Sequence, residues 1–156
     1  MQKPVVAILR IFSGGQTGVD RAALDVAIEL GLEHGGWCPL GRRAEDGRIH
    51  PRYRLWETDD KDYSSRTRLN VADTDGTLLL NRGKLEGGSE LTAQLAEQLQ
   101  KPLLLVDLDH PVDAGIFKEW LNRHRIDTLN IAGPRESKQP GIYQQAVNLL
   151  RRLLSE

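Results

Sequence analysis

The chain of 156 residues is poor in cysteine and carries no excess of basic residues. Its single cysteine, Cys38, has no partner for an internal disulfide, which is typical of proteins from a reducing compartment. The formal net charge of -1 argues against nucleic acid as the main partner, because nucleic-acid-binding domains usually carry a basic excess. These shortages predict a cytoplasmic protein that has no nucleic-acid partner.

Long apolar runs are also missing from the sequence. The first run, residues 5–12, is interrupted by Arg10 and is too short to span a bilayer. It leads into Ser13-Gly14-Gly15 without the small-residue pattern of a cleavage site. We therefore expect neither a signal peptide nor a membrane partner.

Several catalytic and metal-binding motifs are absent as well. The histidines His34, His50, His110 and His124 form no HExxH pattern, and a single cysteine cannot form CxxC. We therefore expect no dedicated zinc or iron site. Cys38 is either a structural thiol or a soft thiolate that meets molybdenum. Because no Gly-x-Ser-x-Gly elbow or nucleophile–base pair is evident, the sequence leaves open whether any reaction is catalysed.

Short aliphatic runs, expected to be strands, alternate with segments of helical periodicity. Hydrophobic residues make up 39% of the chain and charged residues 28%, a balance typical of one soluble domain. Continuous aliphatic runs are typical of strands that are buried on both faces of a parallel sheet. The expected strands are residues 5–12, 34–38, 76–81, 103–107 and 128–132.

The expected helices carry apolar stripes. Val19, Ala22, Ala23, Val26, Ala27 and Leu30 form the first stripe, and Gly31 is predicted to end that helix. Stripes within residues 91–99, 116–121 and 143–154 predict three more helices, and residues 60–71 a shorter one. The alternation predicts a single Rossmann-like α/β domain over residues 1–156. It has three layers: a mainly parallel twisted sheet of about five or more strands, with helices on both faces.

Three glycine-containing loops connect expected strands to expected helices, at the sheet edge where doubly wound folds bind ligands. The first loop holds Gly14, Gly15, Gln16, Thr17 and Gly18. Thr17 and the acid three residues later have the spacing of a capping box, which predicts Thr17 as the N-cap. Glycine lets a ligand approach the backbone, and the amides at a helix start attract an anion. The alternative is a tight turn that needs glycine for its dihedral angles.

The second and third loops add arginine to the same pattern. Residues 81–92 contain Arg82, Gly87, Gly88 and Ser89, and residues 133–137 contain Arg135. Arg135 is either a fork for a phosphate or carboxylate, or a solvated loop side chain. The three loops together predict one shared site for a phosphate or a comparable oxyanion.

A long irregular segment, residues 35–48, follows the second expected strand. Such loops in compact domains are often functional. Trp37 could stack on a planar ring, and Arg42 and Arg43 could meet anionic groups at the rim of the site. In the alternative reading, Trp37 belongs to the core and the arginines to a solvated face.

Taken together, these segments resemble the molybdenum (cofactor) carrier family, a circularly permuted branch of the Rossmann-like SLOG superfamily. The resemblance covers almost the whole chain and is most specific in residues 13–21 (Ser-Gly-Gly-Gln-Thr-Gly-Val-Asp-Arg) and 133–137 (Gly-Pro-Arg-Glu-Ser). It also includes residues 36–39, 81–83 and 87–92. It implies a Rossmann-like fold, homo-oligomers, and a pocket for a nucleotide or for the molybdenum cofactor (molybdopterin), whose phosphate would meet the glycine loops.

The resemblance and the loops favour a binding or carrier protein for the molybdenum cofactor or a related phosphate-bearing pterin or nucleotide. The alternatives are a nucleotide-sensing regulatory domain and a nucleotide-processing enzyme of the phosphoribohydrolase kind. Superfamily hydrolases use Gly-Gly-x-Gly-Thr-x-x-Glu, whereas here Gln94 stands in place of the glutamate. A glutamine cannot stabilise positive charge on a ribosyl carbon as a carboxylate can. Asp20 and Glu90 are candidate acids that could substitute for that glutamate in an N-glycosidic hydrolase, and the non-enzymatic reading is favoured.

Overall fold

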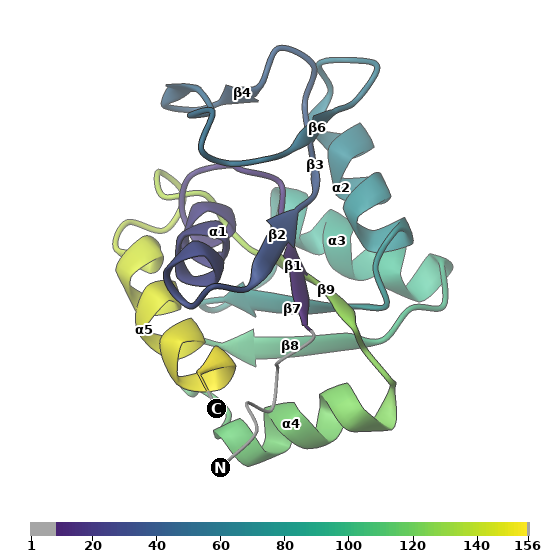
Figure 1. The fold of residues 1–156 in the computed structure, drawn as a ribbon, viewed down its shortest axis with the longest axis vertical. Coiled ribbons are helices and arrows are strands. Elements are labelled where there is room, and N and C mark those ends of the chain that lie inside the picture. Colours follow the sequence, from purple (N-terminus) through teal and green to yellow (C-terminus); the bar gives the residue numbers. More distant parts are fainter. Residues whose placement is uncertain (1–8, 156) are drawn as a thin grey trace.

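Five parallel strands form the central sheet of the computed structural model, which describes residues 9–155 (Figure 1). Their order across the sheet is β2-β1-β9-β7-β8, and every neighbouring pair is parallel. The strands are β1 (Arg10–Phe12), β2 (Glu33–Gly35), β7 (Gly76–Asn81), β8 (Leu103–Asp107) and β9 (Thr128–Ala132). Every residue of β7 is buried, as expected for a strand covered on both faces.

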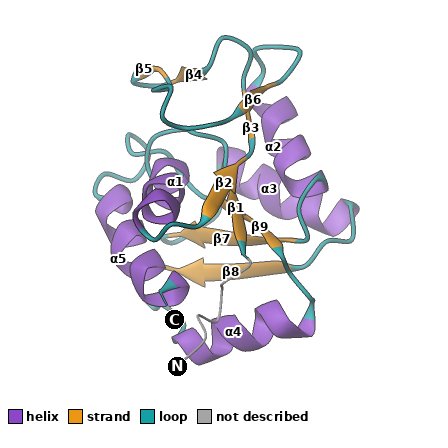
Figure 2. Ribbon diagram, viewed as in Figure 1, coloured by secondary structure: helices purple, strands orange, loops and turns teal. Residues whose placement is uncertain are grey.

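Helices cover both faces of this sheet, and the three-layer prediction is confirmed (Figure 2). On one face, α1 (Val19–Glu29), α4 (Ala114–Arg123) and α5 (Ile142–Leu154) share one apolar cluster with the strands. On the other face, α2 (Tyr63–Ala72) packs against α3 (Gly87–Gln98) through a smaller cluster. Within residues 9–155, no helix is long and apolar enough to cross a membrane.

The second predicted strand, residues 34–38, is wrong as a single element. The chain forms β2, then leaves the sheet, and Trp37–Cys38 (β3) pairs with Trp56–Glu57 (β6) in a separate two-stranded sheet. The break falls at Gly36, where φ is 127° and a Cβ atom would overlap the Ser13 carbonyl. Only glycine fits there, because any other residue has a Cβ atom that would overlap Ser13 and would disfavour the positive φ angle. The first predicted strand survives as β1, and its residues 5–8 lie outside the described residues.

The crossing loop, residues 39–55, lies over the start of α1 (Figure 1). It contains a short antiparallel pair, β4 (Arg43–Ala44) and β5 (Gly47–Arg48). Ile49 and Tyr53 of this loop pack on Leu24 of α1 and on Cys38. The segment predicted to be irregular is therefore held to the domain by a small apolar cluster of its own.

The predicted N-cap of α1 is also wrong. Gly18 occupies the N-cap position, and no side chain caps the helix. The Thr17 hydroxyl instead donates to Glu45 and accepts the Glu136 amide at 3.1 Å. Tertiary partners from the crossing loop and the third loop therefore outcompete the local capping bond.

Candidate functional site

The three glycine-containing loops meet because β1, β9 and β7 are neighbours in the sheet and run in the same direction. Their carboxyl ends open into one cleft of about 370 Å³, which α2 closes from the side. The cleft is lined by Gln16, Tyr63, Ser64, Arg66, Thr67, Asn81, Lys84, Glu86, Gly87, Gly88, Ser89, Leu91, Gly133, Pro134, Arg135, Lys138 and Gln139. The volume is within the range of small-molecule sites, about 300–1,000 Å³.

The N-terminus of α3 opens directly into this cleft. Within residues 9–155, the amides of Gly87 and Gly88 have no hydrogen-bond acceptor, and the Ser89 hydroxyl has no partner. A Cβ atom built on either glycine would meet nothing within 4 Å, so the side-chain positions of both glycines are open. Free N–H groups at a helix N-terminus, together with the positive end of the helix dipole, form an anion-binding position.

Cationic side chains surround the same position. Arg66, Lys84, Arg135 and Lys138 line the cleft, against a single lining carboxylate, Glu86. No carboxylate in the described part of the chain lies within ion-pair distance of Lys84 or Lys138. The field in the cleft therefore favours a negatively charged ligand although the whole chain has a formal charge of -1.

Arg66 is fixed in the cleft wall by a buried ion pair. Its Nη1 donates to Asp20 Oδ2 at 2.8 Å, and the Asp20 side chain is only 3% exposed. Burial raises the pKa of the Asp20 carboxyl, and the charge of Arg66 and the Gln16 amide oppose this shift. The Nε of Arg66 is buried without a hydrogen-bond partner. Asp20 thus positions an arginine toward the cleft and is itself closed off from any ligand.

The glycines of the first loop contact protein atoms rather than open space. A Cβ atom on Gly14 would overlap the guanidinium of Arg66, and one on Gly18 would overlap the Pro134 carbonyl. On Gly15 it would lie 2.8 Å from Leu55 Cδ1. The amide of Thr17 already donates to the Gln16 side chain at 3.0 Å. These glycines allow close packing between loops, and Gln16 is the one residue of residues 14–18 that lines the cleft.

Glu45 of the crossing loop ties the first loop to the third. Its carboxylate accepts hydrogen bonds from the Thr17 hydroxyl, from the Ser137 hydroxyl at 2.5 Å and from the Ser137 amide at 3.1 Å. Arg135 Nε lies 3.5 Å from the same carboxylate. The Thr17 and Ser137 donors that could have met a ligand anion here are thus occupied by an internal one, whereas Arg135 makes only this long ion pair.

The remaining predicted residues lie outside the cleft. Trp37 Nε1 donates to Asp73 at 2.9 Å, and the Arg42 guanidinium donates to backbone carbonyls of residues 49–55. Arg43 is exposed on β4. Arg82 donates to the Pro140 carbonyl and to Gln139, so it joins the second loop to the third. Their predicted contact with the ligand therefore has no support from this arrangement.

The acid and thiol candidates lie elsewhere too. Glu90 is exposed on α3 and does not line the cleft. Cys38 is fully buried beside Leu24 and Ile49, and burial raises the pKa of its thiol. Cys38 therefore lies among apolar side chains and does not line the cleft.

Sequence reasoning missed the contribution of α2 and of two lysines. Tyr63, Arg66 and Thr67 have i, i+3, i+4 spacing, which places them on one face of a helix, and that polar face lines the cleft. This spacing was readable in the sequence. The lysines, Lys84 and Lys138, flank the second and third loops without a recognisable pattern.

Residues 11–154 match the model of the family described as circularly permutated YpsA SLOG. A solved structure of the "putative molybdenum carrier protein" from Syntrophus aciditrophicus SB is 50% identical, with a TM-score of 0.91 and 98% of each chain covered. A second structure, of (E)-4-hydroxy-3-methyl-but-2-enyl diphosphate reductase, is 9% identical over 93% of this chain and 61% of its own. Its TM-score of 0.37 is too low to carry an argument. No curated protein matches the sequence significantly.

Proposed function

The chain belongs to the circularly permutated YpsA SLOG family, and from this premise we propose that it binds and carries a small phosphate-bearing ligand. The free amides of Gly87 and Gly88 at the start of α3, facing open space among four cationic side chains, carry the proposal. A phosphate at this position would accept hydrogen bonds from the helix start and from Ser89, with Arg66 and Arg135 beside it.

The ligand we propose first is the molybdenum cofactor or a related phosphorylated pterin, with a nucleotide as the alternative of the same chemistry. The 50% identical structure is named a "putative molybdenum carrier protein", which supports a molybdenum-bearing ligand. Within residues 9–155, no group of three or more histidine, cysteine or acidic side chains could hold a metal ion. The cleft residues therefore fit the phosphate end of the cofactor, and the protein would hold it there rather than by the molybdenum.

The strength of such a site can be bounded. Each charge-assisted hydrogen bond contributes about 1.5–3 kcal/mol, and the α3 N-terminus about 0.3–1 kcal/mol. Four such contacts at the upper end of these ranges, with an association cost of about 4–5 kcal/mol, correspond to a dissociation constant of about 1 μM. The positions of Asp20, which is buried, and Glu90, which lies outside the cleft, favour binding over hydrolysis.

The Gly88→Asp substitution tests the anion position directly. The new carboxylate would lie in open space at the start of α3, where an acidic side chain suits the helix dipole, so the fold should keep its stability. It would occupy the phosphate position, and we expect the affinity of the cleft for molybdopterin and for adenosine monophosphate to fall at least about tenfold in calorimetry.

The matched control is Gly88→Asn, which adds a side chain of the same shape without the charge. Its affinity for each ligand should lie within a few-fold of that of the unsubstituted protein.

A second pair of substitutions tests the arginines. Arg135→Gln should weaken binding, whereas Arg152→Gln, the same change at an exposed site on α5, should not. If neither ligand class releases or absorbs heat with the unsubstituted protein, the proposed function is wrong.

A further inference from the structure

A second hollow lies at the β2 edge of the sheet, on the face that α2 and α3 cover only in part. Ile11 is fully buried in the α1 cluster, so strand alternation places Arg10 and Phe12 on the opposite face. There α3 covers β7 and β8, and the end of the crossing loop covers β1 and β2 only in part. The result is a hollow of about 520 Å³, called here the edge hollow. It shares no lining residue with the cleft.

One wall of the edge hollow is aromatic and held in place. Trp56 is 55% exposed, yet its ring packs against two aromatic neighbours. The distance between ring centroids is 5.7 Å to Phe12 and 5.5 Å to Trp37. Tyr53, also in the wall, is fixed by a hydrogen bond of 2.5 Å from its hydroxyl to Asp25. An indole that is more than half exposed yet held between two aromatic neighbours can act as a platform on which a planar ring stacks.

The other lining residues are strongly cationic. Arg10, Arg42, Arg48 and Arg54 line the hollow against one carboxylate, Glu33, which Arg10 already pairs at 3.2 Å. Arg42 contributes charge but no donors, because its guanidinium is bonded to backbone carbonyls.

Two arginines keep their donors for a ligand. The guanidinium groups of Arg48 and Arg54 have no acceptor within the described residues, 9–155. The backbone of Arg54 is fixed because its amide donates to His34 Nε2 at 3.1 Å. Free guanidinium donors beside an exposed indole match a ring that carries an anionic group.

We propose that the edge hollow is a second ligand site, which takes a small aromatic ring bearing a phosphate or carboxylate. The ring stacks on Trp56, and Arg54 and Arg48 hold the anionic group. The volume suits a small molecule rather than a polymer, and the formal net charge of -1 disfavours a nucleic-acid chain. The proposal does not depend on the function proposed for the cleft, because the two sites have separate linings.

The test uses the Gly88→Asp protein, in which the cleft is blocked, and adenosine monophosphate as the probe. We expect one molecule to bind per chain and to quench tryptophan fluorescence. Adenosine and inorganic phosphate, each with one half of the chemistry, should bind at least about tenfold more weakly. The same titration in the unsubstituted protein should give two molecules per chain if the cleft also binds, and one if it does not.

Substitutions of residues that line the edge hollow then show whether these side chains bind the ligand or only stabilise the fold. Trp56→Leu should lower the affinity measured by calorimetry by about 5- to 100-fold, as the loss of a stacking platform does. Arg54→Gln, at an exposed side chain, should lower it about tenfold without a change in thermal stability, and Arg152→Gln should leave it unchanged. Binding that Arg54→Gln and Trp56→Leu leave intact would overturn the proposal. So would a dimer in sedimentation that both substitutions dissociate, because the hollow would then be an interface between copies.

Discussion

Among single residues, Glu45 makes contacts that decide the shape of the loops beside the cleft. Its carboxylate joins Thr17 of the first loop to Ser137 of the third, and its own amide donates to Gln16 at 2.8 Å. Partial burial raises the pKa of Glu45, but hydrogen bonds from Ser137 and Thr17 and the charge of Arg135 outweigh it. The pKa of Glu45 is therefore held below its ordinary value, and the carboxylate stays ionised in the folded state.

A pH-dependent loss of stability follows from this lowered pKa. Because the folded protein favours the ionised carboxylate, the stabilisation is present above the ordinary glutamate pKa of about 4.3 and disappears as the pH falls through the folded value. Glu45→Gln should lower the free energy of unfolding by about 1–3 kcal/mol at pH 7, and the difference should shrink as the pH falls below about 4.3. Urea denaturation at pH 7, 5 and 3 measures this. Glu97→Gln, at an exposed site on α3, is the control, and a gap that stays constant with pH would contradict the assignment.

Residue roles in the first loop show what the sequence could not reveal. The glycines were predicted to let a ligand approach the backbone. At Gly14 the group that packs against the backbone is instead the side chain of Arg66, which is 52 positions away in the chain. Gly18 admits Pro134 of the third loop in the same manner. A glycine in a loop indicates that another group approaches the backbone closely. Only the fold shows whether that group belongs to a ligand or to another loop of the chain.

At the scale of elements, strands made of continuous aliphatic runs were predictable and the short strands of mixed composition were not. The bounds of β7, β8 and β9 agree with the predicted residues 76–81, 103–107 and 128–132, because continuous aliphatic runs mark them in the sequence. The separation of β2 from β3 was missed, because it depends on how closely Gly36 approaches Ser13. The polar face of α2 was visible as a spacing, but its position over the cleft follows only from the packing of α2 on α3.

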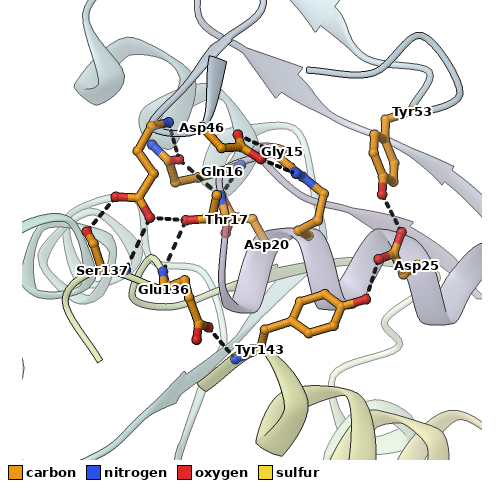
Figure 3. Close-up of polar contacts among 12 residues, drawn as sticks. Gly15, Gln16, Thr17, Asp20, Asp25, Asp46, Tyr53, Glu136, Ser137 and Tyr143 are labelled. Atoms are coloured by element: carbon orange, nitrogen blue, oxygen red, sulfur yellow. Dashed lines mark hydrogen bonds and ion pairs between the residues drawn. The ribbon is translucent and has the colours of Figure 1, made fainter. Parts of the chain in front are cut away.

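Three elements are joined by a single carboxylate outside the cleft. Asp25 of α1 accepts hydrogen bonds of 2.5 Å from the hydroxyls of Tyr53, in the crossing loop, and Tyr143, in α5 (Figure 3). Burial and this hydrogen bond raise the pKa of Tyr143 to about 12, and the same causes raise the pKa of Tyr53. Because both phenols must stay protonated, their stabilisation is complete below about pH 10 and is lost as the pH rises through the folded values.

Asp25→Ala should therefore lower both the stability of the fold and the pKa of two tyrosines. We expect the free energy of unfolding at pH 7 to fall by about 2–4 kcal/mol, since two hydrogen bonds to a charged group are lost. Absorbance at 295 nm should show two of the three tyrosines ionising at lower pH than in the unsubstituted protein. Asp59→Ala, at an exposed position, should change neither quantity. Unchanged tyrosine titration would show that Asp25 does not hold the two hydroxyls in solution.

Across the whole molecule, the cleft is the place where the two helical layers contribute to one site. Gln16 and Arg135 come from loops that lead to α1 and α5, on one face of the sheet. Arg66 and Gly88 belong to α2 and α3, on the other face. A phosphate bound at the start of α3 would therefore contact both layers at once, and its binding free energy would oppose the separation of either layer from the sheet.

Such a ligand should raise the thermal midpoint of the whole domain as one cooperative unit. At a concentration one hundred times the dissociation constant, binding to the folded state alone adds about 2.7 kcal/mol. For a chain of this length that amounts to about 5–10 °C, which calorimetric melting with molybdopterin or adenosine monophosphate can measure. The Gly88→Asp protein should melt at the same temperature as the unsubstituted protein without ligand, and should gain much less from the same ligand concentration. If the midpoint rises equally in both proteins, the stabilising ligand is bound somewhere other than the start of α3, because only that position is blocked by the new carboxylate.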